Sequence, residues 1–284
     1  MIPAAFDYVR PKSVAEALKT VGKDAKFIAG GHSLLPLLKL RLAQPGRLID
    51  IGHLPQLKGI KPAGAGLRIG AATTYRELLE SKPVRDRYPL IAEVTERIGD
   101  LQVRNVGTIG GGLAHADPAA DMPPIMLVLD ATFVLQSKGG KRSVPARKFF
   151  RGPFATALKP NELLTEIRLP GLPKGAGTAY VSFDQAASGY ALVGAAALVA
   201  VAKAKLSRAD LAFTGLADTP FLATLPRLVG TTRDGAADVI AQVAEGAVAG
   251  VEANEDIHAP AEYRIHLAQL AARRALAGAL ARAA

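Results

Sequence analysis

The sequence predicts a folded protein of the α+β class, built from more than one structural unit. Apolar residues make up 49% of its 284 residues and charged residues 21%, which is ordinary for a globular protein with a sizeable core. Stretches typical of short helices and strands alternate through the first two thirds of the chain. In the last third, strands are followed by two alanine-rich helical stretches. This composition excludes disordered, collagen-like and coiled-coil proteins.

The first unit is expected to span residues 1–57. Ser13 and, three residues later, Glu16 are typical of a helix N-terminus, and Gly22 is expected to end that helix. The pattern then predicts a strand, a helix and a second strand, at residues 26–29, 33–42 and 47–51. Residues 52–66 contain two prolines and four glycines, which favours a boundary near residue 57.

The second unit is expected to span residues 58–176. Thr74 and Glu77 repeat the helix-start pattern, and a longer helix is predicted over residues 84–98. Asp117 followed by Pro118 is typical of an N-cap with proline at the first helical position, so a helix is expected to run from there to about residue 129. Strands are predicted at residues 67–71, 132–136 and 163–169, followed by a linker at 170–177.

The third unit is expected to span residues 177–284. A buried strand is predicted over residues 190–203, a partner strand over 210–215, and helices over 236–248 and 261–283. The uncharged run 185–202 approaches the length of a membrane span, but its alanines and glycines favour a buried strand. Charged residues precede any apolar segment at the N-terminus, so no signal peptide is expected and the expected compartment is the cytoplasm.

Several kinds of chemistry are excluded by residue counts. The chain has no cysteine, so it supplies no disulfide, thiolate zinc site, iron–sulfur ligand or cysteine nucleophile. The formal net charge is +10, but the basic residues are scattered and tryptophan is absent, so no nucleic-acid partner is expected. His32 and His115 lack a histidine four residues away, and no Ser-His-Asp arrangement is recognisable. These residues therefore indicate no metal site and no catalytic residue.

Two glycine-rich turns are the strongest candidates for a binding site. The first covers residues 29–34 between a predicted strand and helix, and the second covers 108–112 upstream of a predicted helix. Glycine lets a backbone approach a ligand closely, and successive N–H groups can form an anion cradle. Neither turn matches the Rossmann or P-loop pattern. With Ser33 and Thr108 beside them, a pyrophosphate clamp and plain tight turns both remain open.

Asp117 and Asp121 form a second candidate site. On one helix, residues four apart share a face. The pair could then act as acid and base, hold a divalent metal, or accept hydrogen bonds from ligand hydroxyls. Alternatively, Asp117 is only an N-cap and Asp121 only complements the helix dipole.

Three segments together resemble a known family. They are AGGHSLLPLLKLRL (29–42), TIGGGLAHADPAADMP (108–123) and AEYRIHLAQLAARRAL (261–276). The chain resembles the FAD-binding medium subunit of molybdenum hydroxylases, a group that includes carbon monoxide dehydrogenase and the flavin domain of xanthine dehydrogenase. The resemblance implies the two-subdomain FAD-binding fold of the vanillyl-alcohol-oxidase type, followed by a C-terminal domain of antiparallel sheet and helices. FAD would lie between the first two units.

The resemblance also implies a set of cofactor-binding residues. The first turn would wrap the pyrophosphate and ribityl region through Phe27, Ile28, Ala29, Gly30, Gly31, His32, Ser33 and Leu34. The second clamp would consist of Gly107, Thr108, Gly110, Gly111, Gly112 and Ala114. Asp117 and Asp121 would accept from cofactor hydroxyls, Ile98 and Leu164 would contact the flavin or adenine, and Tyr190 would lie beside the isoalloxazine.

The sequence departs from the family pattern in two places. Gly112 stands where the family usually has asparagine or serine, which removes one side-chain hydrogen bond. The family often has lysine or arginine before the tyrosine, whereas this chain has Ser182, Asp184, Gln185 and Ala186. A cation there would stabilise negative charge on reduced flavin, so the flavin potential and the electron acceptor stay open.

The implied function is an electron relay. A molybdenum-binding large subunit would oxidise the substrate, two [2Fe–2S] clusters on a small subunit would pass electrons, and this FAD would hand them to an external acceptor. A heterotrimer, or a dimer of heterotrimers, is the implied assembly. Two alternatives are a stand-alone FAD-dependent reductase of the same broad fold and an adaptor that has lost FAD. The organic substrate is not implied by this chain.

Overall fold

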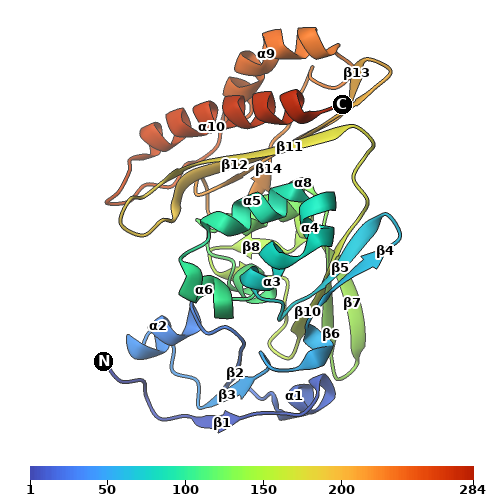
Figure 1. Ribbon diagram of the computed structural model, residues 1–284. Helices are drawn as coiled ribbons and strands as arrows, with labels where there is room; N and C mark the ends of the chain where they lie inside the picture. The colour runs from blue at the N-terminus through green and yellow to red at the C-terminus, as the bar shows by residue number, and fades with distance from the viewer.

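The computed structural model describes residues 1–284 as three sheet-based units that follow one another along the chain (Figure 1). The first unit lies at the bottom of the view, the second in the middle, and the third at the top, where the C-terminus lies. The three main sheets have three, five and four strands. Their strands are therefore contributed by successive parts of the sequence.

The first unit is a parallel sheet in the order β1-β3-β2 with two short helices. Its elements are β1 (Asp7–Val9), α1 (Val14–Thr20), β2 (Ala25–Ile28), α2 (Leu34–Lys39), β3 (Arg47–Asp50) and the 3₁₀ helix η1 (Pro55–Leu57). Ser13 caps α1 by accepting from the Glu16 N–H at 3.1 Å. Helix α2 is shorter than predicted, because Leu40 is its C-cap and Arg41 takes a left-handed conformation with φ of 58°.

The second unit is an antiparallel sheet, β4-β5-β10-β6-β7, with helices packed against it (Figure 1). Its strands are β4 (Ile60–Ala63), β5 (Gly66–Gly70), β6 (Thr132–Ser137), β7 (Gly140–Pro145) and β10 (Leu163–Leu169), and a separate hairpin pairs β8 (Phe150–Gly152) with β9 (Ala155–Thr156). Its helices are α3 (Tyr75–Glu80), α4 (Lys82–Arg87), α5 (Pro89–Arg97), α6 (Leu101–Val106), α7 (Ile109–His115), α8 (Met122–Val128) and the 3₁₀ helix η2 (Ala146–Lys148). Thr74 and Glu77 form the expected capping box of α3.

Two helix predictions in this unit are wrong. The single helix expected over 84–98 is two helices, because Tyr88 leaves the helical conformation and Pro89 begins α5. The helix expected to begin after Asp117 begins at Met122, with prolines in its first turn. Asp117 instead accepts from the Ala119 N–H at 2.9 Å, which closes a local turn rather than capping α8.

The third unit is an antiparallel sheet, β11-β12-β13-β14, covered by two helices. Its elements are β11 (Ala176–Asp184), β12 (Ala191–Ala202), β13 (Lys205–Thr214), β14 (Phe221–Leu222), α9 (Arg233–Gly246) and α10 (Ala261–Arg282). Strand β11 was not predicted. The uncharged run forms β12 in the middle of the sheet, and no helix is both long and apolar enough to cross a bilayer.

Strand β12 is rich in alanine because both of its faces are covered. Ala195 and Ala197 belong to the core shared with α9 and α10, whereas Ala196 and Leu198 belong to the core of the second unit. Successive residues of a strand point to opposite faces, so small side chains let both layers approach the sheet. The third unit therefore packs directly on the second.

Candidate functional site

The first glycine-rich turn leaves a run of backbone donors unused. It joins the end of β2 to the start of α2, and Gly31 has a φ of +76°. None of the backbone N–H groups from Ala29 to Leu34 donates to a protein oxygen. Ser33 occupies the N-cap position of α2, but its hydroxyl makes no capping hydrogen bond. Consecutive unpaired N–H groups of this kind form an anion-binding concavity.

The second glycine-rich stretch is a helix N-terminus rather than an open turn. Thr108 caps α7 by accepting from the Gly111 N–H at 3.1 Å. The N–H groups of Ile109 and Gly110 donate to the carbonyls of Thr73 and Ala71 at 3.0 and 2.9 Å. The donors of this first helical turn are thus used within the protein. The expected second clamp therefore differs from the first in having few free N–H groups.

The two glycine stretches meet at the border of the first and second units. A Cβ on Gly30 would overlap the Val106 carbonyl oxygen and lie 2.8 Å from the Gly107 Cα. Gly110 is held against Ala71, whose Cα lies 2.8 Å from the position of a Cβ on Gly110. Glycine is required at these positions because backbone packs directly on backbone.

A cleft of about 300 Å³ opens where the two stretches meet. The first unit contributes Ala29, Asp50, Gly52 and His53, and the second contributes Lys58, Ala72, Thr74, Asn105, Val106 and Thr108. Sequence reasoning named only Ala29 and Thr108 among these. Lys58 adds a cation to the cleft, and Asn105 adds a side-chain amide. Asn105 lies three residues before the second glycine stretch, and that proximity in sequence is the one signal that could have identified it.

The expected flavin end of the site contains acidic and tyrosine side chains. The Tyr180 hydroxyl on β11 donates to Asp121 Oδ1 at 2.5 Å, so one oxygen of this carboxylate is already engaged. Tyr190 lies just before β12 and is 48% exposed. Burial, and then the charges of Asp117 and Asp121, raise the pKa of Tyr190. The structure thus brings both carboxylates and Tyr190 into one neighbourhood.

Asp117 and Asp121 nevertheless do not share a helix. Asp117 follows α7 and lies 3.9 Å from His115 Nε2, whereas Asp121 directly precedes α8. Burial lowers the pKa of His115, whose ring packs at a tilt against Phe154 with a centroid distance of 5.1 Å. The expected common helix face is therefore wrong, and any joint role of the two carboxylates depends on the turn between α7 and α8.

The remaining predicted cofactor-binding residues differ in how deeply they are buried. Phe27 and Ile28 are half-buried on β2, and Ala114 is half-buried on α7. Ile98 caps the C-terminus of α5, where its carbonyl accepts from Arg104 at 3.0 Å. Leu164 is only 3% exposed within the core of the second unit. His32 is exposed on the first turn, and the contacts of all six residues with a cofactor stay predictions.

A cation reaches the segment where the expected basic residues are missing. Arg97, at the end of α5, pairs with Asp184 at 2.9 Å and lies 5.9 Å from the centroid of the Tyr180 ring. Ser182 on the same strand has a buried hydroxyl oxygen without a hydrogen-bond partner. The positive charge near residue 184 therefore comes from the second unit, and an aspartate partly neutralises it.

Asp121→Asn is expected to make the stability of the FAD-free chain less sensitive to pH. The pKa of Asp121 is raised from 3.8 to about 6, mainly by burial. The negative charge of Asp184 also raises this pKa, whereas the hydrogen bond from Tyr180 and the positive charge of Arg97 lower it. A raised pKa in the folded state means that the carboxyl stabilises the fold at low pH and that this contribution is lost as pH rises through the folded pKa. Between about pH 4.5 and pH 8, wild type should lose roughly 2 kcal/mol relative to the variant. Parallel denaturant titrations measure this difference, and coinciding pH profiles would contradict it.

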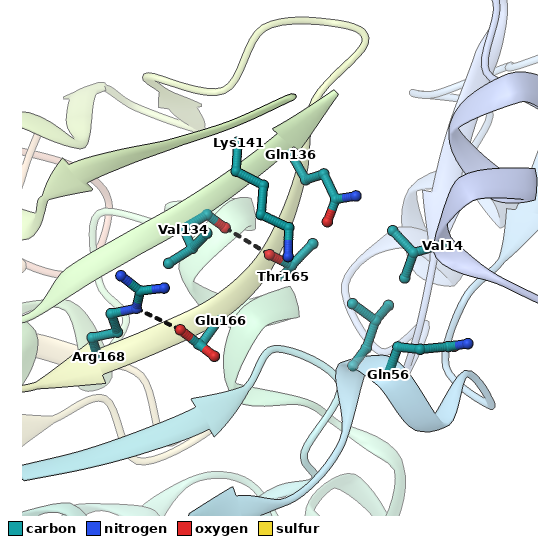
Figure 2. Close-up of a pocket in the computed structure, with 9 residues that line it drawn as sticks. Val14, Gln56, Val134, Gln136, Lys141, Thr165, Glu166 and Arg168 are labelled. Carbon is teal, nitrogen blue, oxygen red and sulfur yellow. Dashed lines mark hydrogen bonds and ion pairs between the residues drawn. The ribbon is translucent and has the colours of Figure 1, made fainter. Parts of the chain in front are cut away.

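A second cleft, of about 250 Å³, lies between the first unit and the five-stranded sheet and shares no residue with the candidate site (Figure 2). Val14 and Gln56 of the first unit face Gln136, Lys141 and Thr165 across it. Two of its polar side chains are engaged within the protein, since Thr165 donates to the Val134 carbonyl at 3.1 Å and Arg168 to Glu166 at 2.5 Å. No glycine-rich turn lines it.

Comparisons with known proteins match the chain along nearly its whole length. Residues 4–172 match the family model described as the FAD binding domain in molybdopterin dehydrogenase, and residues 178–279 match the CO dehydrogenase flavoprotein C-terminal domain. The carbon monoxide dehydrogenase medium chain of Hydrogenophaga pseudoflava is 41% identical and covers 100% of both chains. A subunit of the 6-hydroxypseudooxynicotine dehydrogenase complex of Paenarthrobacter nicotinovorans is 37% identical over 100% of this chain and 97% of its own length.

Solved structures agree with this match. A structure of carbon monoxide dehydrogenase from Hydrogenophaga pseudoflava superposes with a TM-score of 0.95 at 41% identity, covering 100% of both chains. Quinoline 2-oxidoreductase from Pseudomonas putida 86 superposes with a TM-score of 0.93 at 33% identity, covering 99% of both chains. Both the FAD-binding part and the C-terminal sheet with its helices are therefore shared, and the expected fold class is confirmed.

Proposed function

Because this chain belongs to the family of FAD-binding medium subunits of molybdenum hydroxylases, we propose that it relays electrons through one non-covalently bound FAD. The observation that carries the proposal is the run of unpaired N–H groups from Ala29 to Leu34, which begins at a residue that lines the cleft. Such a cradle suits a pyrophosphate, because N–H dipoles can replace the water around its negative oxygens. No cysteine is available to link a flavin covalently.

The surrounding residues fit the rest of this cofactor. We propose that the Ser33 hydroxyl and the Lys58 ammonium group bind phosphate oxygens, and that Asp117 and Asp121 accept from cofactor hydroxyls. The free oxygen of Asp121 and the half-buried state of Asp117 support these roles. The exposed ring of Tyr190 would then cover the isoalloxazine. Bound FAD supplies the capacity to accept electrons one at a time and to release two.

The glycines of the second stretch have a mainly steric role in this proposal. Because the N–H groups of Ile109, Gly110 and Gly111 are engaged within the protein, they do not add to the cradle. Gly107 instead lets Gly30 of the first turn approach closely, and Gly110 lets the N-terminus of α7 pack against Ala71. Thr108, whose hydroxyl can still donate, is the polar group of this stretch that we expect to contact FAD.

The absence of cysteine bears on which partner subunits this chain would need. Iron–sulfur clusters need thiolate ligands, and the chain has no cysteine, so clusters must be held by another polypeptide. We propose that a small subunit with two [2Fe–2S] clusters delivers electrons and that a molybdenum-binding large subunit oxidises the substrate. The carbon monoxide dehydrogenase relatives are named as medium chains, which supports an assembly with other subunits. A heterotrimer or its dimer is the proposed assembly.

We further propose the division into two FAD-binding subdomains, residues 1–57 and 58–176, and a C-terminal domain, 177–284. The strands of the three main sheets support it, because the parallel sheet ends at Asp50, the five-stranded sheet spans residues 60–169, and the third sheet begins at Ala176. In this arrangement FAD would lie between the first two units, and the third would close the flavin end.

The proposal is tested by comparing the purified chain with the co-expressed complex. Acid treatment of the chain should release FAD into the supernatant, and dithionite should bleach the visible flavin band. The chain alone should oxidise no aldehyde, N-heterocycle or carbon monoxide with an artificial acceptor, whereas the complex with both partner subunits should be active on its own substrate. Release of FMN, a colourless protein, or substrate oxidation by the chain alone would each reject the proposal. Turnover with NAD(P)H and an enolpyruvyl sugar nucleotide would favour a stand-alone reductase.

A further inference from the structure

Tyr75 fills the side of the second glycine stretch. It is the first residue of α3, only 7% of it is exposed, and its ring lies against the helix junction between α6 and α7. A Cβ on Gly107 would lie 3.2 Å from the ring carbon Cδ2. A Cβ on Gly112 would overlap the Tyr75 hydroxyl oxygen and lie 3.7 Å from Cζ. The hydroxyl therefore occupies the position that a side chain at residue 112 would take.

The Tyr75 hydroxyl has no partner within the protein. By contrast, the buried Tyr88 donates to the Pro170 carbonyl at 2.5 Å, and the partly buried Tyr180 donates to Asp121 at 2.5 Å. A buried phenol normally satisfies its O–H group. The Tyr75 oxygen is not among the sealed, unpartnered polar atoms of the chain, so it reaches accessible space. Its donor is thus free and points out of the core.

The surroundings of this hydroxyl are those of the flavin end of the site. Burial raises the pKa of Tyr75, and the neighbouring Tyr190 and Asp121 raise it further. Tyr75 is therefore neutral near pH 7 and available only as a neutral donor or acceptor. Tyr190 and Asp121 are the two residues proposed above to lie beside the flavin ring and the cofactor hydroxyls.

We propose that the Tyr75 hydroxyl donates a hydrogen bond directly to the flavin end of bound FAD, in place of a side chain at residue 112. Gly112 and Tyr75 then form one unit: glycine makes room, and the phenol supplies the polar group. This inference rests on the proposed placement of FAD. It explains why a position beside the cofactor can be glycine without loss of a donor there.

The test is FAD affinity of the full-length chain after removal of the cofactor. Tyr75→Phe, which deletes one oxygen from an otherwise unchanged ring, should raise the dissociation constant about 3- to 10-fold and shift the visible flavin band. Tyr88→Phe is the matched control, because it deletes the hydroxyl of another buried tyrosine, one that donates to the Pro170 carbonyl. The control should lower the melting temperature and leave FAD affinity unchanged.

Residue 112 offers an independent check. The methyl group of Gly112→Ala would displace the Tyr75 hydroxyl, so this variant should weaken FAD by a similar factor. In the Tyr75→Phe background the same substitution meets only the ring carbon at 3.7 Å and should have no further effect. If Tyr75→Phe binds FAD as tightly as wild type, or if the two substitutions are fully additive, the proposal is overturned. Failure of wild type itself to bind FAD would instead reject the proposed function.

Discussion

Gly30→Ala is expected to abolish retention of FAD, with a loss of affinity of at least about 100-fold, because overpacking against backbone displaces whole segments. The added methyl group would overlap the Val106 carbonyl oxygen and lie 2.8 Å from the Gly107 Cα, and neither atom can move without shifting α6 or α7. The first glycine-rich turn would have to move away from the second glycine stretch. Its cradle of N–H groups would then no longer face the cleft. The measurement is the ratio of flavin to protein after gel filtration.

Gly22→Ala provides the control for this prediction. Gly22 lies in the same unit, and a Cβ there would have no neighbour within 4 Å. The control should therefore keep both its fold and its FAD. The third unit should stay folded in both variants, because its core consists of its own strands and of α9 and α10. Full flavin occupancy in Gly30→Ala would show that the two stretches can separate without loss of the site.

Arg264→Ala should destabilise the third unit by about 3–5 kcal/mol, because several charge-assisted hydrogen bonds are lost in a buried place. Arg264 on α10 is only 4% exposed. Its Nη1 donates to the carbonyls of Leu192 and Gly215 at 2.6 and 3.0 Å, and Nη2 donates to Asp256 at 2.7 Å. This one side chain thus ties the start of β12, the end of β13 and the loop before α10 together.

Arg273→Ala is the matched control, because Arg273 lies on the same helix and is exposed. Its replacement should change the free energy of unfolding by less than about 0.5 kcal/mol, as is usual for surface positions. Urea titrations followed by circular dichroism measure both variants. Equal midpoints for the two would mean that backbone carbonyls near Arg264 find other donors. Arg264→Lys should recover part of the stability, since an ammonium group can reach fewer of the three acceptors at once.

Local sequence determined where several elements begin. Ser13 and Thr74 predicted helix starts that the structure confirms, and strand β10 has the predicted limits 163–169. These features depend on neighbouring residues, because a cap or a short apolar strand satisfies its own backbone locally. The sequence also identified the two glycine stretches, and its resemblance to the FAD-binding medium subunits is confirmed by the family matches. The sequence pattern did not show which other residues the two glycine stretches contact.

Only the tertiary structure decided the form of the second glycine stretch. Glycine disfavours a helix by about 1 kcal/mol per residue, so Gly110, Gly111 and Gly112 argue locally for a loop. Helix α7 forms because Ile109 and Leu113 are buried in the core. Its first N–H groups also donate to the carbonyls of Ala71 and Thr73, which are distant in the sequence. The N–H groups of the first turn, by contrast, have no acceptor within the protein. Contacts between residues distant in sequence therefore determine which of two similar glycine stretches keeps unpaired N–H groups.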